Sequence, residues 1–373
     1  MTTENYNEGS PLKIAVVGTG FGSRVQIPGF LKIPGVQIVG VMSTGRPERA
    51  EQVARDFNIP FATADYQQLL QLPELDAVSI VSPPYQHAQQ SIMALQAGKH
   101  VLCEKPMARD VTEARAMLDA ARNSGLVAMI DHEFRYVPAR AYMKQLINEG
   151  FLGELYLANI TLFSGSSADP SARPFGWLSQ RETGGGYLGA VGSHYIDALH
   201  YMFGDIAAVA AQLETFVPRR PLPDSNEWRE VETEDSFTLL CRFARGGKAT
   251  VNVSVVARFG PGERIEAYGS KGTLLIDSDG RLQGGLTGEE RLRPLEIPAH
   301  YQGGLSSDDP RLRPFVTLAT DFVNAVRAAK AAGRPLGQEV NPSFGDGYRV
   351  QQVLDAARQA AESNTWVSLS PSR

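Results

Sequence analysis

The amino-acid sequence predicts a two-domain α/β protein. A parallel sheet with helices on both faces comes first, and an α+β domain on an open, mostly antiparallel sheet follows. The 373 residues correspond to two or three domains at roughly 150 residues each. Short apolar strands alternate with helices over residues 12–130, an order typical of parallel sheets. After residue 131 longer segments alternate between apolar and polar side chains, as antiparallel strands with one solvated face do.

The first domain is expected to cover residues 11–131, after a polar, disordered tail over residues 1–10. Its strands are short apolar runs bounded by a glycine, a proline or a helix. Pro47 is a typical first residue of a helix, and Gly98 is a typical residue to end one. The predicted strands are Leu12–Val17, Val36–Val41, Asp76–Val81, His100–Cys103 and Leu126–Ile130. The predicted helices are Ser23–Lys32, Pro47–Phe57, Tyr85–Ala97 and Asp110–Asn123.

The second domain is expected to cover residues 132–373. Alternating apolar residues predict antiparallel strands at Leu155–Phe163, Ala207–Phe216, Ser236–Phe243, Ala249–Ala257 and Arg264–Tyr268. Segments rich in glycine, proline and charge, Pro218–Glu234 and Gly280–Pro310, are expected to be loops. Helices are predicted at Pro138–Asn148, Val316–Ala332 and Phe344–Glu362.

Composition excludes several classes of protein. With 36 basic and 41 acidic residues the net charge is −5, whereas dedicated nucleic-acid binders usually carry a basic excess. No apolar run is long enough to span a bilayer, and the polar start has no secretory pattern. The two cysteines, Cys103 and Cys241, are too few for a disulfide framework or a zinc site. We therefore expect a cytoplasmic protein with no membrane or nucleic-acid partner and no metal.

A glycine-rich turn follows the first strand and opens the first helix. Its residues are Gly18, Thr19, Gly20, Phe21 and Gly22, and Ser23 stands where a third glycine is usual. Glycines at this place let the backbone approach a pyrophosphate, and the helix N-terminus supplies free N–H groups. The context predicts a dinucleotide site, with a glycine-rich turn of another α/β protein as the alternative.

The end of the second strand bears on which dinucleotide binds. An NAD site usually has Asp or Glu here to bind the ribose hydroxyls, but residues 40–46 contain no acid. Ser43, Thr44 and Arg46 could instead bind a 2′-phosphate, which favours NADP. The alternative is that Arg46 is a solvated loop residue and the protein takes either cofactor.

Two further strand ends should line the same crevice, because cofactors bind at the carboxyl ends of parallel strands. Ser82, Pro83 and Pro84 would shape the nicotinamide side, and His87 is either a cofactor contact or an exposed helix residue. Glu104 and Lys105 precede Pro106 after the His100–Cys103 strand. Lys105 could serve as an acid or base if partly buried, although most lysines are simply solvated.

A glycine-rich segment, Gly184–Asp197, contains His194 and Asp197 three residues apart, which places both on one helix face. Such a pair allows a carboxylate to orient an imidazole. The alternative is a helix start whose His and Asp serve packing and capping. Two such residues are too few for a closed metal site.

Taken in order, these motifs resemble the glucose–fructose oxidoreductase / inositol dehydrogenase / MocA (Gfo/Idh/MocA) family over nearly the whole chain. The matching segments are GTGFGS after the first strand, SPPYQH, AGKHVLCEKP (Ala97–Pro106), FRYVPA (Phe134–Ala139) and GGGYLGAVGSHYID. The resemblance implies an N-terminal Rossmann domain and a C-terminal domain whose large open sheet supports a homodimer or homotetramer. It also implies hydride transfer between a nicotinamide and a hydroxyl carbon of a sugar, inositol or related polyol.

Residue by residue, the resemblance gives Lys105 as acid/base or substrate anchor and His194 as general base or its partner. The family often has Asp four residues before that histidine, where this chain has Ala190. Two alternative functions therefore stay open, an NAD-dependent glycoside hydrolase of the same fold and a non-catalytic NADP-binding protein. Candidate substrate residues are Arg173 and Trp177 in the segment Asp169–Trp177, together with Arg135, Tyr136, Asp197 and Arg258.

Overall fold

The protein is described by a computed structural model that covers residues 11–301, 312–332 and 340–369. Its first sheet has six strands, all parallel, in the order β3-β2-β1-β4-β5-β6. These strands are β1 (Leu12–Val17), β2 (Val36–Met42), β3 (Ala62–Thr63), β4 (Ala77–Ile80), β5 (His100–Cys103) and β6 (Ala128–Ile130). Strands β2 and β3 are added on one side of β1, and β4 to β6 on its other side. This change in the order of strands creates a crevice between β1 and β4 at their carboxyl ends.

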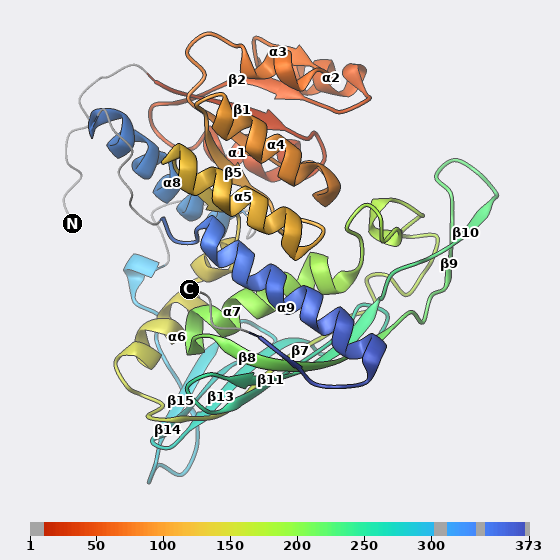
Figure 1. The fold of residues 1–373 in the computed structure, drawn as a ribbon. Helices are drawn as coiled ribbons and strands as arrows, with labels where there is room; N and C mark the ends of the chain where they lie inside the picture. Colours follow the sequence, from red (N-terminus) through yellow and green to blue (C-terminus); the bar gives the residue numbers. More distant parts are fainter. Residues whose placement is uncertain (1–10, 302–311, 333–339, 370–373) are drawn as a thin grey trace.

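Helices cover this sheet, as the alternating pattern predicted (Figure 1). They are α2 (Pro47–Phe57), α3 (Tyr66–Leu70), α4 (Pro84–Gln96) and α5 (Val111–Ser124). The first helix differs from the predicted Ser23–Lys32, because it opens as a π-helix at Gly22–Gln26 and continues as the short α1 (Ile27–Phe30). Pro28 has no N–H to donate within the ladder, which is consistent with this irregularity. The sequence did not predict the short β3 and α3.

The second sheet has nine strands in the order β16-β15-β14-β13-β7-β12-β11-β8-β17. In chain order they are β7 (Leu155–Phe163), β8 (Ile206–Glu214), β11 (Ser236–Phe243), β12 (Lys248–Ser254), β13 (Gly262–Gly269), β14 (Gly272–Ile276), β15 (Leu282–Leu286), β16 (Arg293–Pro294) and β17 (Val367–Ser368). Most neighbours are antiparallel, but β12 pairs with β7 in parallel. No hairpin joins β7 to β12, so tertiary packing rather than a turn sets their relative direction.

Two segments expected to be loops contain strands. Within Pro218–Glu234, β9 (Arg219–Pro221) and β10 (Trp228–Glu230) form a separate antiparallel ribbon. Within Gly280–Pro310, β15 and β16 extend the edge of the large sheet, and residues 302–310 of that segment lie outside the described residues. The expected tail over residues 1–10 also lies outside them. Strands β9, β10 and β16 have only two or three residues and carry too little apolar pattern to be recognised in a sequence, and β15 (LQGGL) has two glycines and only its end residues apolar.

Helices α6 (Pro138–Asn148), α7 (Ser193–Phe203) and α9 (Phe344–Ser363) lie over one face of the second sheet (Figure 1). The remaining long helix, α8 (Leu312–Ala332), behaves differently, although it falls within the range expected for the second domain. Its apolar residues join the core of the first sheet beside Ile14 and Val25. Phe315 meets Phe30 edge to face at a centroid distance of 5.4 Å, so the chain returns to the first sheet near its end.

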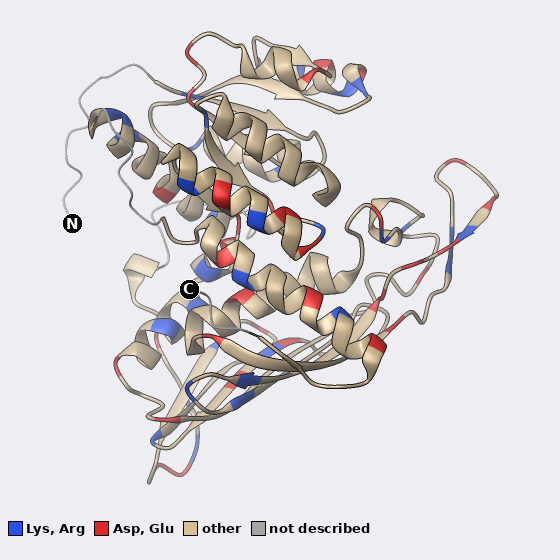
Figure 2. Ribbon diagram, in the orientation of Figure 1, with Lys and Arg blue, Asp and Glu red and all other residues tan. Residues whose placement is uncertain are grey.

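The segment before α9 connects the two sheets. The Ile130 N–H at the end of β6 donates to the Pro342 carbonyl at 3.2 Å, and Met129 forms a bridge with Ser343. Phe344 at the start of α9 is buried in the hydrophobic core of the first sheet, whereas Val350 and Leu354 lie in the hydrophobic core of the second sheet. Among the described residues, no helix is long and apolar enough to cross a membrane. Basic and acidic residues are interspersed along the elements (Figure 2).

Replacing Phe315 by alanine should destabilise the protein by about 3–5 kcal/mol, because it leaves a cavity where α8 packs on the first sheet. Both Phe315 and Phe30 are almost fully buried. The measurement is the urea midpoint of unfolding, with Phe216→Ala as the control because that side chain is 65% exposed. Equal midpoints for the two variants would contradict the packing role assigned to Phe315.

Candidate functional site

The glycine-rich turn after β1 lies at the crevice between β1 and β4. Gly18 has φ +119, and a Cβ there would lie 2.4 Å from the Val81 carbonyl oxygen. A Cβ at Gly20 would meet nothing within 4 Å, so that glycine borders open space. A Cβ at Gly22 would press on Val16 at 3.1 Å. Glycines that bind a dinucleotide have three roles: they form a tight turn, let the pyrophosphate come close to the backbone, and allow the helix to pack closely on the strand. Gly18, Gly20 and Gly22 match these roles, so this turn fits such a cofactor.

The residues expected to select the cofactor lie next to this turn. Thr19 Oγ1 donates to Ser43 Oγ at 3.2 Å, which ties the glycine turn to the end of β2. Thr44 Oγ1 donates to Gln86 Oε1 of α4 at 2.9 Å. Arg46 is exposed at the start of α2. The structure therefore joins Thr19 to Ser43, ties Thr44 to α4 and leaves Arg46 at the rim.

The loop after β4 is held by buried polar contacts. Ser82 Oγ donates to Gln90 Oε1 at 2.6 Å. His87 is 1% exposed, so it is not the exposed helix residue considered above. Its Nε2 lies 2.7 Å from the Ser82 carbonyl and its Nδ1 lies 3.0 Å from the Pro106 carbonyl. The neutral ring can donate to only one of these carbonyls, but both nitrogens lie against them, so His87 connects the Ser82–Pro84 loop to the loop after β5.

Lys105 reaches from the end of β5 to the glycine-rich segment of the second domain. Its Nζ donates to the Ala190 carbonyl at 2.9 Å. Ala190 lies in a π-helical turn, Leu188–Gly192, that runs directly into α7. Pro106 lies beside Gly189, where a Cβ would stand 3.5 Å from its ring. The loop with Lys105 and Pro106 therefore packs directly against the turn that leads into the helix that carries His194.

Behind Lys105, the Glu104 side chain is buried and hydrogen-bonded inside the first domain. Gln26 Nε2 donates to Glu104 Oε1 at 2.9 Å and to Asp131 Oδ2 at 3.0 Å. Ser79 Oγ in turn donates to Gln26 Oε1 at 2.5 Å. Burial raises the pKa of Glu104 and raises that of Asp131 well above its usual value. Two carboxyl groups are thus held close together inside the first domain.

His194 lies against the segment that follows β6, the 3₁₀ turn Glu133–Tyr136. Its ring stacks on Phe134 with centroids 3.7 Å apart and planes 10° apart. Its Nε2 lies 4.0 Å from Glu133 Oε1. Burial lowers the pKa of His194 well below its usual value, and Lys105 adds to this effect by repelling a second positive charge. The imidazole is therefore neutral at physiological pH and able to accept a proton.

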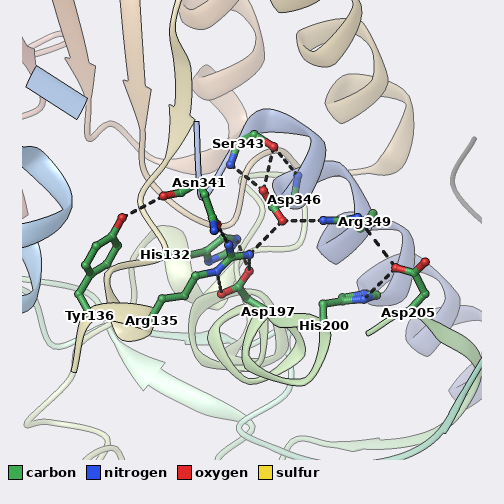
Figure 3. A network of polar contacts seen from close by, with 10 residues as sticks. All are labelled: His132, Arg135, Tyr136, Asp197, His200, Asp205, Asn341, Ser343, Asp346 and Arg349. Atoms are coloured by element: carbon green, nitrogen blue, oxygen red, sulfur yellow. Dashed lines mark hydrogen bonds and ion pairs between the residues drawn. The ribbon is translucent and has the colours of Figure 1, made fainter. Parts of the chain in front are cut away.

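Asp197 does not orient His194, as the spacing of three residues had suggested. It forms a bidentate pair with Arg135, at 2.8 Å from Nε to Oδ2 and 2.5 Å from Nη2 to Oδ1. Arg135 also donates to Asp346 Oδ1 at 3.1 Å and to Asn341 Oδ1 (Figure 3). The Tyr136 hydroxyl lies 2.8 Å from Asp321 Oδ2 and 2.9 Å from the Asn341 carbonyl. Arg135, Tyr136 and Asp197 thus join elements of the protein to one another and do not offer free groups to a substrate.

The other expected substrate residues lie on surface loops. Arg173 and Trp177 line a cavity of about 190 Å³, which neither Lys105 nor His194 borders. The Arg173 guanidinium stands over the Tyr187 ring at 5.8 Å. Arg258 is exposed and donates to the Ala168 carbonyl at 3.1 Å. The structure therefore separates these three residues from the pair formed by Lys105 and His194.

Four residues at this site were missed by the sequence reasoning, and they are Gln26, Asp131, Glu133 and Phe134. Three of them follow the carboxyl end of β6, a position at which crevice residues are expected in a parallel sheet. Gln26 gave no signal, because only its place on the irregular first helix aims it inward. Among the described residues, no group of three or more His, Cys, Asp or Glu side chains is arranged to hold a metal ion.

Models of known protein families match two parts of the chain. An oxidoreductase family with an NAD-binding Rossmann fold, GFO_IDH_MocA, matches residues 12–132, and the GFO/IDH/MocA C-terminal domain matches residues 141–275. An uncharacterized oxidoreductase of Synechocystis, sll0816, is 33% identical, with 96% of each chain covered. The chain belongs to the Gfo/Idh/MocA oxidoreductase family. The resemblance and the fold predicted from the sequence are thereby confirmed.

Levoglucosan dehydrogenase from Pseudarthrobacter phenanthrenivorans is similar to this oxidoreductase over most of its length. The two sequences are 30% identical, with 96% of this chain and 98% of the relative covered. A solved structure of levoglucosan dehydrogenase in its apo form has a TM-score of 0.87 at 28% identity, with 98% of this chain and 100% of that chain covered. Another, with a TM-score of 0.87 at 28% identity and 96% and 99% coverage, is a complex with NADH and levoglucosan.

Replacing Arg135 by alanine should cost about 3–5 kcal/mol at neutral pH, because it leaves the buried Asp197 without its cation and Asp346 with Arg349 alone. Burial alone would raise the pKa of Asp346, but Arg135, Ser343 and Arg349 together hold it below its ordinary value. A carboxyl with a lowered folded-state pKa contributes stability above its unfolded pKa, and this contribution is lost as the pH falls. The variant should therefore lose less stability than the wild type on acidification below about pH 4.

The measurement is the urea midpoint of unfolding at several pH values. Arg115→Ala is the control, because its ion pair with Asp119 lies on the surface and should leave the midpoint nearly unchanged. A parallel fall in stability with acid for wild type and Arg135→Ala would show that the pair with Asp346 has no part in the acid response.

Proposed function

We propose that this oxidoreductase is an NADP-preferring dehydrogenase that oxidises a hydroxyl carbon of a sugar, inositol or related polyol. The observation that carries the proposal is the contact between Lys105 and the start of the helix that bears His194. It supports a site in which the amino group of Lys105, after β5, and the neutral imidazole of His194, on α7, serve the same edge of the sheet as the glycine turn after β1. Levoglucosan dehydrogenase, a relative with a similar fold, is known in complex with NADH and a sugar, which supports this substrate class.

The glycine turn at Gly18–Gly22 would hold the pyrophosphate of a nicotinamide dinucleotide, which supplies the hydride acceptor when bound. His194 accepts the proton of the substrate hydroxyl, and Lys105 donates a hydrogen bond to the same oxygen, or the two exchange roles. The neutral imidazole favours His194 as the acceptor. Stacking on Phe134 fixes the plane of its ring, so the accepting nitrogen keeps one direction.

Substitution of Lys105 or His194 by alanine should lower kcat by roughly 10²–10⁴, the usual contribution of acid–base groups. NADPH affinity should be retained, because neither side chain is placed against the glycine turn. The measurement is turnover on a panel of sugars, polyols and sugar acids, with the exposed Lys248→Ala as control. Full turnover by both variants would show that the assignment is wrong.

Preference for NADP rests on Ser43, Thr44 and Arg46, since the end of β2 has no acid to bind ribose hydroxyls. Arg46→Ala should weaken NADPH binding by roughly 10-fold or more, the value of a charge-assisted hydrogen bond, and leave NADH binding unchanged. Fluorescence titration of purified protein with both cofactors measures this, and the neighbouring exposed Arg49→Ala is the control. Equal or stronger binding of NADH by the wild type would overturn the preference.

A second candidate function follows from Ala190, where the family often has aspartate. A protein that binds NADP without turnover fits this difference, and tight NADPH binding with no turnover on the whole panel would favour it. A glycoside hydrolase that uses bound NAD transiently would instead release aryl glycosides without net cofactor reduction.

We further propose a homodimer or homotetramer formed through the second sheet. One face of that sheet is covered by helices, and its other face presents exposed Tyr156 and Leu240 on β7 and β11 (Figure 1). A cytoplasmic location is proposed from the two cysteines, which are both free and buried. No nucleic-acid partner is proposed, in keeping with the net charge of −5.

A further inference from the structure

A cavity of about 190 Å³ lies in the second domain, and neither Lys105 nor His194 borders it. Its walls come from two segments far apart in the chain, the loop 173–179 and the residues in and next to the ribbon of β9 and β10 (Figure 1). The Phe175 N–H donates to the Pro221 carbonyl at 2.8 Å, which holds the loop against the ribbon. Since a cavity of about 150 Å³ can hold benzene, this one has room for a six-membered ring.

Two guanidinium groups border this cavity without an acidic partner. Arg220 is 4% exposed, and its Nη1 and Nη2 donate to the carbonyls of Arg173 and Ser167 at 3.0 and 2.9 Å. Arg173 is exposed, and its guanidinium stands over the Tyr187 ring. Among the described residues, both groups contact carbonyls or a ring, and neither forms an ion pair with Asp or Glu. Because a buried charge without a counter-ion is costly, the two groups favour an anion in the cavity.

Two carboxyl groups also line the cavity, and backbone amides contact both. The two oxygens of Asp235 accept from the N–H groups of Phe216 and Val217 at 3.1 and 2.8 Å. Glu234 Oε1 accepts from the Leu188 N–H at 2.8 Å, and burial raises the pKa of Glu234. These contacts and this shift weaken the repulsion that the two carboxyl groups exert on an anion. They also leave Glu234 able to accept a hydrogen bond from a ligand hydroxyl.

Aromatic side chains complete the lining of the cavity. Trp177 lines it and is 38% exposed, so its indole also meets solvent. Tyr187 is 8% exposed, and its hydroxyl contacts Ser167 Oγ. Small-molecule sites commonly combine aromatic walls with a few converging polar groups. A pyranose ring has apolar C–H faces and a polar rim of hydroxyls, so it matches a wall of this kind.

We propose that this cavity is a second binding site, for a sugar acid, that is, a pyranose ring that carries a carboxylate. The ring packs on the Trp177 indole. The carboxylate binds the guanidinium groups of Arg173 and Arg220, which face one anion because Arg220 contacts the Arg173 backbone. Glu234 accepts a hydrogen bond from a ring hydroxyl. This site goes beyond the proposed dehydrogenase function and does not depend on it.

The test is calorimetric titration of the full chain, free of cofactor, with D-glucuronate and D-glucose, which carry a carboxylate and a CH₂OH group at the same position. The wild type should bind D-glucuronate roughly 10-fold more tightly or better, the value of a charge-assisted hydrogen bond. Arg173→Ala should remove most of this difference, and it should fold because the side chain is exposed. Arg229→Ala is the control, an exposed arginine of β10 outside the cavity. Equal affinity for both sugars in the wild type, or binding of neither, would overturn the inference.

Fluorine NMR locates the bound sugar. The chain has three tryptophans, Trp177, Trp228 and Trp366, so protein labelled with 5-fluorotryptophan gives a small set of signals that Trp177→Phe assigns. D-glucuronate should shift the signal of Trp177 and leave that of Trp366, which lines no part of this cavity, in place. A Trp177 signal that does not move while D-glucuronate binds would overturn the inference.

Variants of the crevice separate this site from the proposed active site. Lys105→Ala and His194→Ala should bind D-glucuronate as the wild type does, because neither side chain lines the cavity. Loss of D-glucuronate binding in both variants would place the sugar in the crevice and overturn the inference. NADPH binding and turnover test the proposed function on their own, so either proposal can fail while the other stands.

Discussion

The ion pair between Arg135 and Asp197 is the interaction on which the rest of the site depends. Arg135 follows the last strand of the first sheet, Asp197 lies on the helix that carries His194, and Asp346 lies at the start of α9. One buried guanidinium therefore joins three elements that belong to two different sheets (Figure 3). Because truncating a buried pair leaves an uncompensated charge, these elements have little freedom to move apart. The contacts of Arg135 with Asp197 and Asp346 therefore help to set the position of His194 relative to Lys105.

Small residues make the second condition for the cofactor turn. Gly18 lets the chain pass close to Val81, and Gly20 leaves space above the turn. A backbone approach as close as that of Gly18 is available only where a side chain is missing. Lys105 is placed in another way, by the hydrogen bond from its Nζ to the Ala190 carbonyl.

Carboxyl groups give the site its acid–base character. Glu104, Asp131 and Glu133 lie close together with Gln26 and Lys105 as their main polar neighbours, so burial raises the pKa of each. The imidazole of His194 is neutral for the same reason, since burial disfavours its charged form. Burial thus disfavours the charged forms of the imidazole and of these carboxyl groups at the same edge of the first sheet.

The sequence by itself determined the parallel sheet and the glycine turn, because these depend on local period and spacing. The roles of Lys105 and His194 were expected only from the family resemblance and stay predictions. Residues 12–130 folded as that pattern predicted, apart from the irregular first helix and the short β3 and α3. Only the tertiary structure decided the partners of the polar side chains. His194 and Asp197 share a helix, yet one faces Glu133 and the other Arg135. The return of α8 to the first sheet and the parallel pairing of β7 with β12 were decided in the same way. Such pairings are set by packing between segments that can lie 211 residues apart, as Arg135 and Asp346 do, which no local pattern encodes.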